Sequence, residues 1–439
     1  MRNYAFWGTN GDESVRLLPD GYSGGPNVFT VVVGKNGVGK SRLLSNLARE
    51  HREDDRGGAV IAISTSPFDK FPLVSRNSPS QTLDHYTYVG MRDGVYTHSS
   101  SVSLISAAAR GLIRKLAEQD ELVDLSHVFS SMGLEPYVRF TFKLNRIDPG
   151  LSRRIAPIDD PRLSPLQEAL AVPLRPEQAK RLQRLSDVQL AGLRTLVGQL
   201  RMQDKAATKA AFLGVHFANG PAEIGTHSFN SRTLRALAAA MEAGLVRLMD
   251  IELHKQAFGP LSLKRASSGE QCLLVLLLGI AGNIENGALV LIDEPEISLH
   301  PKWQEDFMQM LMRAFSGYRG CQFIIATHSP QITSRLQGDH CFIASLSKQQ
   351  LYAAGDFSSR SADFQLAELF EAPGLMNEYI SRLAFSLLAR LKARQAVGEE
   401  ESGDLARLRQ LSRNLDHNDP TFELVRSVTQ AFAHYAVDR

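Results

Sequence analysis

The segment Gly34-Lys35-Asn36-Gly37-Val38-Gly39-Lys40-Ser41 has the residue types and spacing that bind phosphate. It fits the pattern GxxxxGK[ST], in which glycines let backbone N–H groups turn toward phosphate oxygens. A helix starting near Lys40 would add the partial positive charge of its N-terminus. We expect Lys40 to reach the β- and γ-phosphates and the Ser41 hydroxyl to bind Mg²⁺. The predicted phosphate-binding residues are Asn36, Gly37, Val38, Gly39, Lys40 and Ser41.

A second chemical feature is the carboxylate pair Asp293-Glu294, which follows an apolar run. Asp293 is predicted to hold Mg²⁺ through water and so to complete the coordination begun by Ser41. Glu294 can orient and deprotonate an attacking water. The alternative for such a pair is a solvated turn or helix start, and the phosphate-binding segment upstream favours the catalytic interpretation.

His328 is the third chemical feature. It follows an apolar run, within the segment Thr327-His328-Ser329. A lone histidine is most often structural. At the carboxyl end of a central strand, where open α/β sheets bind ligands, His328 is better interpreted as a contact to the γ-phosphate or to the attacking water.

A second anion site is predicted at Ser267-Ser268-Gly269, which directly precedes a strongly apolar helical run at 272–280. A serine hydroxyl, backbone N–H groups exposed by glycine and a helix N-terminus converge there. Taken alone, the segment could equally be a helix cap. Because one chain has one phosphate-binding loop, this second site is expected to serve the nucleotide of another subunit.

We expect the elements that position these residues to form an α/β fold. Short apolar, β-branched runs are predicted as buried strands at Val28–Val33, Val60–Ser64, 86–91, 288–292 and Gln322–Ala326. Leucine and alanine recur at helical spacing within 96–245, which predicts a helical insertion. Sheet-like patterning at 250–265 predicts a hairpin around Gly259-Pro260. We therefore expect four regions: an N-lobe with the phosphate loop at 1–95, a helical insertion at 96–245, a C-lobe at 246–350 and a mostly helical C-terminal region at 351–439.

Composition excludes several classes of protein. The chain has 439 residues and a formal net charge of +2, too balanced to indicate nucleic acid from bulk charge. Its three cysteines lack metal-site spacing, which favours reduced thiols. The longest apolar run, 272–280, is far shorter than the ~20 residues of a membrane span. The sequence therefore predicts a cytoplasmic protein without a membrane partner.

The motif set resembles the ABC-type ATPases of the SMC, RecF and OLD group, the branch that includes AAA15 and AAA21 proteins. The segment 34–41 looks like their GxNGxGKS loop, and Ser267 and Gly269 fall on the serine and second glycine of the signature motif. Ser268 stands where that motif has its first glycine. Thr327-His328-Ser329 matches the switch histidine.

The string 293–301 looks like the DEPExxLHP of the RecF/OLD-like branch; transporter relatives have aspartate where this chain has His300. No glutamine of the Q-loop type follows the run at 86–91, where Met91-Arg92-Asp93 stands. The resemblance covers 1–95 and 246–350. It implies an ABC-type P-loop nucleotide-binding domain, an ATPase that uses ATP and Mg²⁺, with Glu294, His328 and Lys40 as catalytic residues.

The resemblance also implies a head-to-tail homodimer or higher homo-oligomer around ATP. The compact size looks most like stand-alone anti-phage defence ATPases of the Septu type, which act with a separate nuclease. Two alternatives remain open: a DNA-repair or chromosome-maintenance ATPase, and a self-contained nuclease. Residues 340–439 show no Toprim-like pattern, and Asp416-His417-Asn418-Asp419 reads as a solvated loop rather than a metal site.

Two further segments are candidate partner surfaces. Residues 173–209 contain eight basic and three acidic residues, a net charge of +5. Such a face could bind nucleic acid, be a solvated helical surface or pack against an acidic partner. An apolar stripe at 376–394 is better interpreted as core.

Overall fold

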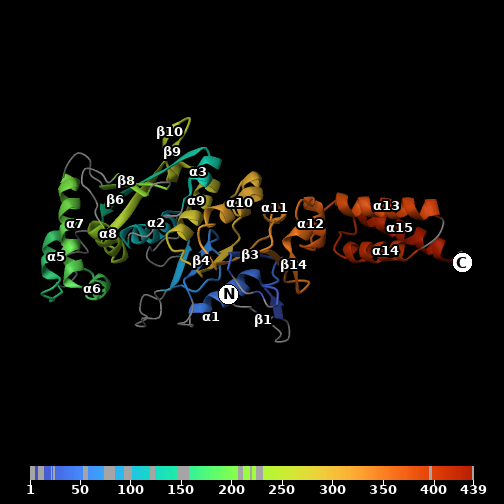
Figure 1. The fold of residues 1–439 in the computed structure, drawn as a ribbon, viewed down its shortest axis with the longest axis horizontal. Coiled ribbons are helices and arrows are strands. Elements are labelled where there is room, and N and C mark those ends of the chain that lie inside the picture. The colour runs from blue at the N-terminus through green and yellow to red at the C-terminus, as the bar shows by residue number, and fades with distance from the viewer. Residues whose placement is uncertain are drawn as a thin grey trace. The chain divides into compact units, whose positions relative to one another are not determined.

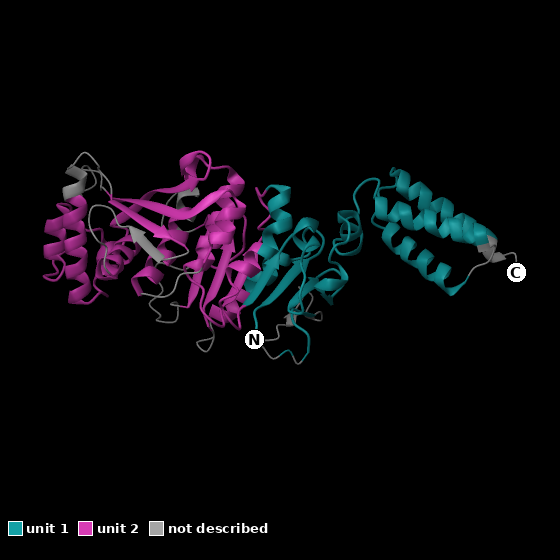
Figure 2. Ribbon diagram, turned by 45° about the horizontal axis from the view of Figure 1, so that its top comes forward, with its two compact units in different colours: residues 1–46, 300–309, 322–439 teal, residues 47–299, 310–321 magenta. Residues whose placement is uncertain are grey.

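The computed structural model describes residues 5–7, 14–20, 22, 25–52, 58–73, 85–92, 101–118, 124–145, 158–205, 211–217, 220–223, 231–394 and 398–437. These residues form two compact units (Figure 2). Unit 1 comprises 1–46, 300–309 and 322–439, and unit 2 comprises 47–299 and 310–321. Helices α1 (Lys40–Arg52) and α10 (Pro301–Ala314) contribute residues to both.

Four of the described strands of unit 1 pair in the order β14-β13-β3-β12. β3 pairs in parallel with both β12 and β13, and β13 pairs antiparallel with β14. Every residue of β3, β12 and β13 is buried, as expected of parallel strands. The bounds are β3 Val28–Val33, β12 Gln322–Ala326, β13 Cys341–Ser345 and β14 Gln350–Ala353. A separate hairpin pairs β1 (Ala5–Trp7) with β2 (Ser14–Arg16).

The C-terminal part of unit 1 is helical, as predicted (Figure 1). Its helices are α11 (Pro330–Ser334), α12 (Ala362–Glu368), α13 (Glu378–Arg394), α14 (Glu399–Ser412) and α15 (Pro420–Val437). We call α13, α14 and α15 the C-terminal bundle. The stripe at 376–394 faces its core, where Ile380, Leu387 and Leu391 are fully buried.

Acidic residues determine two connections in this part. The acidic, glycine-flanked sequence at 398–403 favours a solvated loop by composition, yet residues 399–403 begin α14, because three glutamates are favourable in the first turn of a helix. Residues 416–418 are exposed, as predicted for the loop before α15, whereas Asp419 is buried, and its side chain accepts hydrogen bonds from the N–H groups of Met376 and Thr421. The segment before α15 is therefore anchored by Asp419.

Unit 2 contains three parallel strands in the order β11-β4-β5. Their bounds are β4 Val60–Ser64, β5 Tyr86–Gly90 and β11 Leu289–Asp293. Helix α9 (Ser268–Ala281) contacts β4, and its residues 273–281 are all buried. The apolar run at 272–280 is thus a core helix, and no helix within the described ranges is long and apolar enough to cross a membrane.

The region 96–245 is not wholly helical, which corrects the prediction. It contributes β6 (Leu134–Leu144), β7 (Ala211–His216) and β8 (Gly220–Glu223) to an antiparallel sheet of order β10-β9-β6-β7-β8. β9 (Val246–Lys255) and β10 (Gly259–Ser262) form the predicted hairpin. Alternating burial along β6, with Val138, Phe140 and Phe142 inward, explains why this segment is a strand.

The helices among the described residues of this region are α2, α3, α5, α6, α7 and α8. Among them α2 packs against α8 and α9, and α7 packs against α5 and α8. Their bounds are α2 Ser101–Glu118, α3 Ser126–Ser131, α5 Ser164–Leu170, α6 Pro176–Leu182, α7 Asp187–Lys205 and α8 Ser231–Glu242.

Candidate functional site

The glycine-rich loop of unit 1 connects β3 to α1. Its glycines have the positive φ angles that L side chains rarely adopt: 151° at Gly34, 79° at Gly37 and 109° at Gly39. A Cβ atom at Gly34 would lie 3.0 Å from Val38 Cγ1 and 3.1 Å from Ser347 Oγ. The loop conformation therefore requires glycine at these positions, as a backbone cradle for phosphate does.

Lys40 is buried at the start of α1, and its ammonium group points back into the loop. Nζ donates to the carbonyl oxygens of Gly34 at 2.7 Å and Lys35 at 3.2 Å. The same Nζ lies 3.1 Å from His328 Nδ1. Unit 1 thus brings the predicted phosphate-binding lysine and the predicted switch histidine into direct contact.

His328 is held at the carboxyl end of β12 by its two neighbours. The N–H of Thr327 donates to Val32 O at 3.2 Å, which extends the parallel pairing of β12 with β3. Ser329 caps α11 by accepting from the N–H of Gln331 at 3.2 Å, and its hydroxyl lies 2.6 Å from Gln304 Oε1. Since β3 and β12 are parallel neighbours, the loop and the histidine follow the same edge of the sheet.

Unit 2 holds the predicted carboxylate pair. Asp293 is the last residue of β11, is buried, and aligns with Ser64 on β4, whose hydroxyl donates to Asp293 O at 3.3 Å. Glu294 follows with φ of 50°, a left-handed conformation that is strained for a residue other than glycine. Residues with such strained backbones are concentrated at functional sites, where the strain helps to pre-organise the site.

Ser267 caps the 14-residue helix α9, also in unit 2. Its hydroxyl donates to Glu270 Oε2 at 2.8 Å, its N–H donates to the same oxygen at 2.8 Å, and it accepts from the N–H of Glu270 at 3.3 Å. Ser267 and Ser268 are exposed, whereas Gly269 is buried. The helix-cap interpretation of this segment is confirmed, and the exposed N-terminus keeps it accessible to an anion.

Glu270 is itself held by Lys255 of β9, whose Nζ lies 3.0 Å from Glu270 Oε1. Burial disfavours the Glu270 carboxylate, but hydrogen bonds from Lys255 and Ser267 outweigh it and lower the pKa of Glu270. The carboxylate is therefore charged and fixed beside Ser267, and β9 of the antiparallel sheet is tied to the start of α9.

Arg92, at the position where a Q-loop glutamine was sought, forms a structural ion pair. Its guanidinium contacts both carboxylate oxygens of Asp69, which is buried and also accepts from Tyr88 OH at 2.8 Å. Sequence reasoning missed this pair because the two residues lie on different segments, after β4 and after β5. Asp93 lies outside the described residues.

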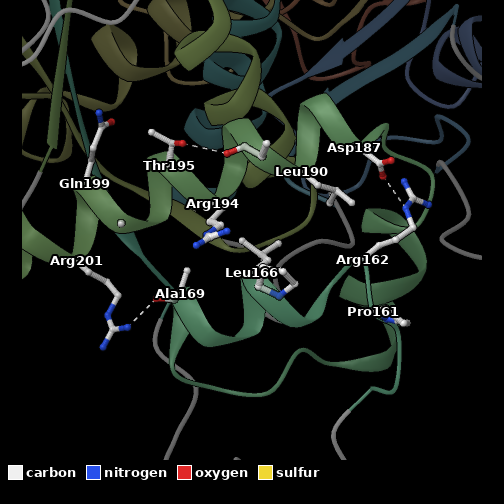
Figure 3. A pocket seen from close by; sticks show the side chains of 13 residues that line it. Pro161, Arg162, Leu166, Ala169, Asp187, Leu190, Arg194, Thr195, Gln199 and Arg201 are labelled. Atoms are coloured by element: carbon white, nitrogen blue, oxygen red, sulfur yellow. Dashed lines mark hydrogen bonds and ion pairs between the residues drawn. The ribbon is translucent and has the colours of Figure 1, made fainter.

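A groove of about 1080 Å³ lies between α5 and α7 in unit 2 (Figure 3). Its lining includes the apolar residues Leu166, Ala169 and Leu190. The arginines Arg162, Arg194 and Arg201 also line it. Arg162 pairs with Asp187 at 2.8 Å, and Arg201 donates to Ala169 O at 2.7 Å. Arg194 is exposed and has no hydrogen bond or ion pair among the described residues.

The basic segment 173–209 is distributed over several environments. Lys180 and Arg184 are exposed, whereas Arg181 donates to the carbonyl oxygen of Glu242. Lys209 and the side chain of Lys205 lie outside what the structure describes. Within the described ranges, no group of three or more His, Cys, Asp or Glu side chains could hold a metal ion, and the three cysteines form no disulfide.

A parallel α/β arrangement whose β3 runs through a positive-φ glycine loop into a helix defines a P-loop nucleotide-binding protein. Residues 29–334, more than half of the chain, match the family described as "AAA domain, putative AbiEii toxin, Type IV TA system". The chain belongs to this AAA domain family.

Two curated relatives share shorter segments. The chain is 27% identical over 164 residues to the "Retron Ec83 probable ATPase" of Escherichia coli, which covers 33% of this chain and 30% of that protein. It is 34% identical over 90 residues to the "Retron Vc95 probable ATPase" of Vibrio cholerae serotype O1 biovar El Tor. This match covers 18% of this chain and 17% of that protein. The chain thus matches less than a third of the length of either relative.

Proposed function

We propose that this chain is an ATP-binding and ATP-hydrolysing switch. The observation that carries the proposal is the contact between Lys40 of the glycine-rich loop and His328, which follows β12. Lys40 now donates to loop carbonyls, which are weak partners for an ammonium compared with phosphate oxygens. Bound ATP would take over Lys40 for its β- and γ-phosphates, and His328 would then lie beside the γ-phosphate.

The oxygen ligands that Mg²⁺ prefers are present in the chain. Ser41 supplies a hydroxyl at the start of α1, and Asp293 supplies a carboxylate at the end of β11. This hydroxyl and carboxylate set is the one that P-loop proteins use for Mg²⁺. Ser41 and Asp293 would hold the ion, which would supply positive charge to stabilise the transferring phosphoryl group.

Glu294 is the proposed general base. Glu294 follows directly after the proposed metal residue Asp293, and its backbone is held in the left-handed region with φ of 50°. A glutamate there can orient a water and accept its proton as the γ-phosphoryl group is transferred. The cap of α9 at Ser267 and Ser268 would supply the second anion site, contributed to the ATP of another copy.

The biological role we propose is control of a separate effector, a nuclease, in anti-phage defence. The resemblance to Septu-type ATPases motivates it, and the description of two curated relatives as probable ATPases of retrons supports an ATPase role. The self-contained nuclease alternative gains no support from the described residues, among which no three His, Cys, Asp or Glu side chains are grouped to hold a metal ion.

Direct contact with nucleic acid is a second candidate, and the groove between α5 and α7 favours it. Arg194 lines this groove without an ionic partner among the described residues, and Arg162 and Arg201 lie in the same lining (Figure 3). Arginines so placed can bind phosphate groups. Among the described residues of the lining there is no aromatic side chain, so the contact we propose here is to the nucleic-acid backbone rather than through base stacking.

Phosphate release from ATP tests the main proposal. The parent protein should hydrolyse ATP in Mg²⁺, and Lys40→Ala should lose ATP binding in calorimetry because the charge paired with the phosphates is gone. Lys70→Ala, at an exposed lysine outside the loop, should bind ATP normally. Unchanged ATP affinity in Lys40→Ala would contradict the assignment of the loop.

A further inference from the structure

The second residue of the glycine-rich loop, Lys35, is held by the C-terminal part of unit 1. Its Nζ lies 3.3 Å from Glu371 Oε2 and donates to Asn414 Oδ1 at 3.0 Å. Its N–H donates to Ser347 Oγ at 3.3 Å. The loop that we propose to bind ATP is therefore joined to residues more than three hundred positions away, outside every motif of the site.

The two partners of Lys35 come from turns of the helical region. Glu371 follows α12, and Asn414 follows α14 at the end of the second helix of the C-terminal bundle. The side chain of Glu371 is 21% exposed and that of Lys35 is 47% exposed. Solvent thus screens this ion pair only in part, and the Asn414 amide adds a hydrogen bond.

Buried polar side chains fix the segment that carries Glu371. Asn377 donates to Pro373 O at 2.8 Å and Asp363 O at 3.1 Å and accepts from the N–H of Ile380 at 3.1 Å. Asp419 accepts from the N–H of Met376 at 2.9 Å. These anchors order the chain between α12 and α13, so the Glu371 carboxylate is presented from a fixed backbone.

A second set of contacts runs beside the first. Lys348, next to Ser347, lies 3.7 Å from Glu368 Oε2. Glu368 Oε1 accepts from Tyr379 OH of α13 at 3.0 Å and from Arg407 Nε of α14 at 2.8 Å. The turn that contacts the loop at Lys35 is therefore connected to two helices of the bundle.

We propose that Glu371 and Asn414 are positioning residues through which the C-terminal bundle sets the ATP affinity of the loop. The path is short: the two side chains hold Lys35 Nζ, and Lys35 O accepts from Lys40 Nζ at 3.2 Å. Fixing Lys35 keeps this peptide, and the glycine N–H groups that follow it, in the conformation that receives phosphate. The inference rests on the proposed ATP binding.

Linkage makes the effect reciprocal. If the contacts of Lys35 with Glu371 and Asn414 raise the ATP affinity of the loop, bound ATP must stabilise those contacts by the same factor. The C-terminal helices would then report the nucleotide state of the loop to whatever binds them. The expected factor is modest, since a half-exposed ion pair changes affinity by about threefold.

Calorimetry of ATP binding to full-length variants tests the proposal. Glu371→Gln and Asn414→Ala should each weaken ATP binding by about threefold, and Glu371→Lys by about tenfold because it places like charges together. Arg382→Gln is the matched control, since it removes an exposed ion pair of α13 with Glu378. In a Lys35→Gln background, Glu371→Gln should have no further effect, which a general loss of stability would not produce.

Hydrogen exchange gives a second readout. Amides of 371–377 should exchange more slowly with ATP than without it in the parent, and this difference should shrink in Lys35→Gln. Parent-like affinity in Glu371→Lys and Asn414→Ala, together with unchanged exchange, would overturn the inference while leaving the proposed function intact. A parent protein that binds no ATP would overturn both.

Discussion

At the scale of single residues, the sequence was informative wherever chemistry demands a fixed residue type. The positive φ angles of Gly34, Gly37 and Gly39 are what a GxxxxGK[ST] pattern implies, and the lysine and histidine predicted to share a phosphate do lie in contact. The partners of Lys35 could not be predicted, because no local pattern connects residue 35 to residues 371 and 414.

Glu294→Gln should bind ATP as tightly as the parent and lose hydrolysis by at least about a hundredfold, because an amide cannot accept the proton of the attacking water. Single-turnover phosphate release measures the loss, and calorimetry measures the binding. Glu305→Gln, at a partly exposed glutamate of α10 that pairs with Lys302 and Arg335, is the control. Parent-like turnover in Glu294→Gln would mean that another residue is the base.

His328→Ala should slow turnover by about tenfold or more while changing the Kd for ATP far less, because the contact is expected to matter most as charge develops on the γ-phosphate. His328→Gln, which keeps a hydrogen-bond donor, should recover part of the rate. If His328 has only a structural role, both variants should lower the midpoint of thermal unfolding. In that case kcat would not fall more than the affinity for ATP does.

At the scale of elements, strands buried on both faces were predicted almost to the residue. Val28–Val33, Val60–Ser64 and Gln322–Ala326 have the expected bounds, because continuous β-branched runs bounded by polar residues are unambiguous. β6 was missed, since its partner β9 lies about a hundred residues further on and leucine-rich helical spacing dominates the segments around it. The alternation of Val138, Phe140 and Phe142 was the local signal for this strand, whereas its pairing with β9 leaves none.

The cap of α9 gives a stability prediction for one element. Ser267→Ala should lower the free energy of unfolding by about 1 kcal/mol, because the N–H of Glu270 loses its acceptor. Ser268→Ala, one residue into the helix and equally exposed, should change it much less. Urea denaturation followed by circular dichroism compares the two; equal losses would argue against the cap.

The groove between α5 and α7 gives a second element-scale prediction. Arg194→Glu should weaken binding of a labelled single-stranded oligonucleotide and reduce the slope of log affinity against log salt by about one phosphate contact. Lys180→Glu with Arg184→Glu tests the exposed part of the basic segment; Arg181 is left unchanged because it holds Glu242 O. A parent protein that binds no DNA or RNA at low salt would end this interpretation.

At the scale of the whole molecule, the proposed catalytic groups are divided between two compact units. Unit 1 holds the glycine-rich loop, His328 and the C-terminal bundle, and unit 2 holds Asp293, Glu294 and the cap of α9. A chain with one such loop and one signature segment can complete two sites in a two-fold, head-to-tail dimer. ATP but not ADP would stabilise this dimer, because only ATP presents a third phosphate to the second copy.

The most direct test of this account mixes two inactive variants, Lys40→Ala and Ser267→Arg. Each should hydrolyse no ATP alone, the first because the loop fails and the second because the arginine blocks closure. Their heterodimer has one site with both defects and one with neither, so a mixture that exchanges freely should recover about a quarter of the parent activity. Purifying heterodimers through two different tags ensures that exchange has occurred. Recovered hydrolysis supports a shared site, whereas heterodimers without activity would contradict it.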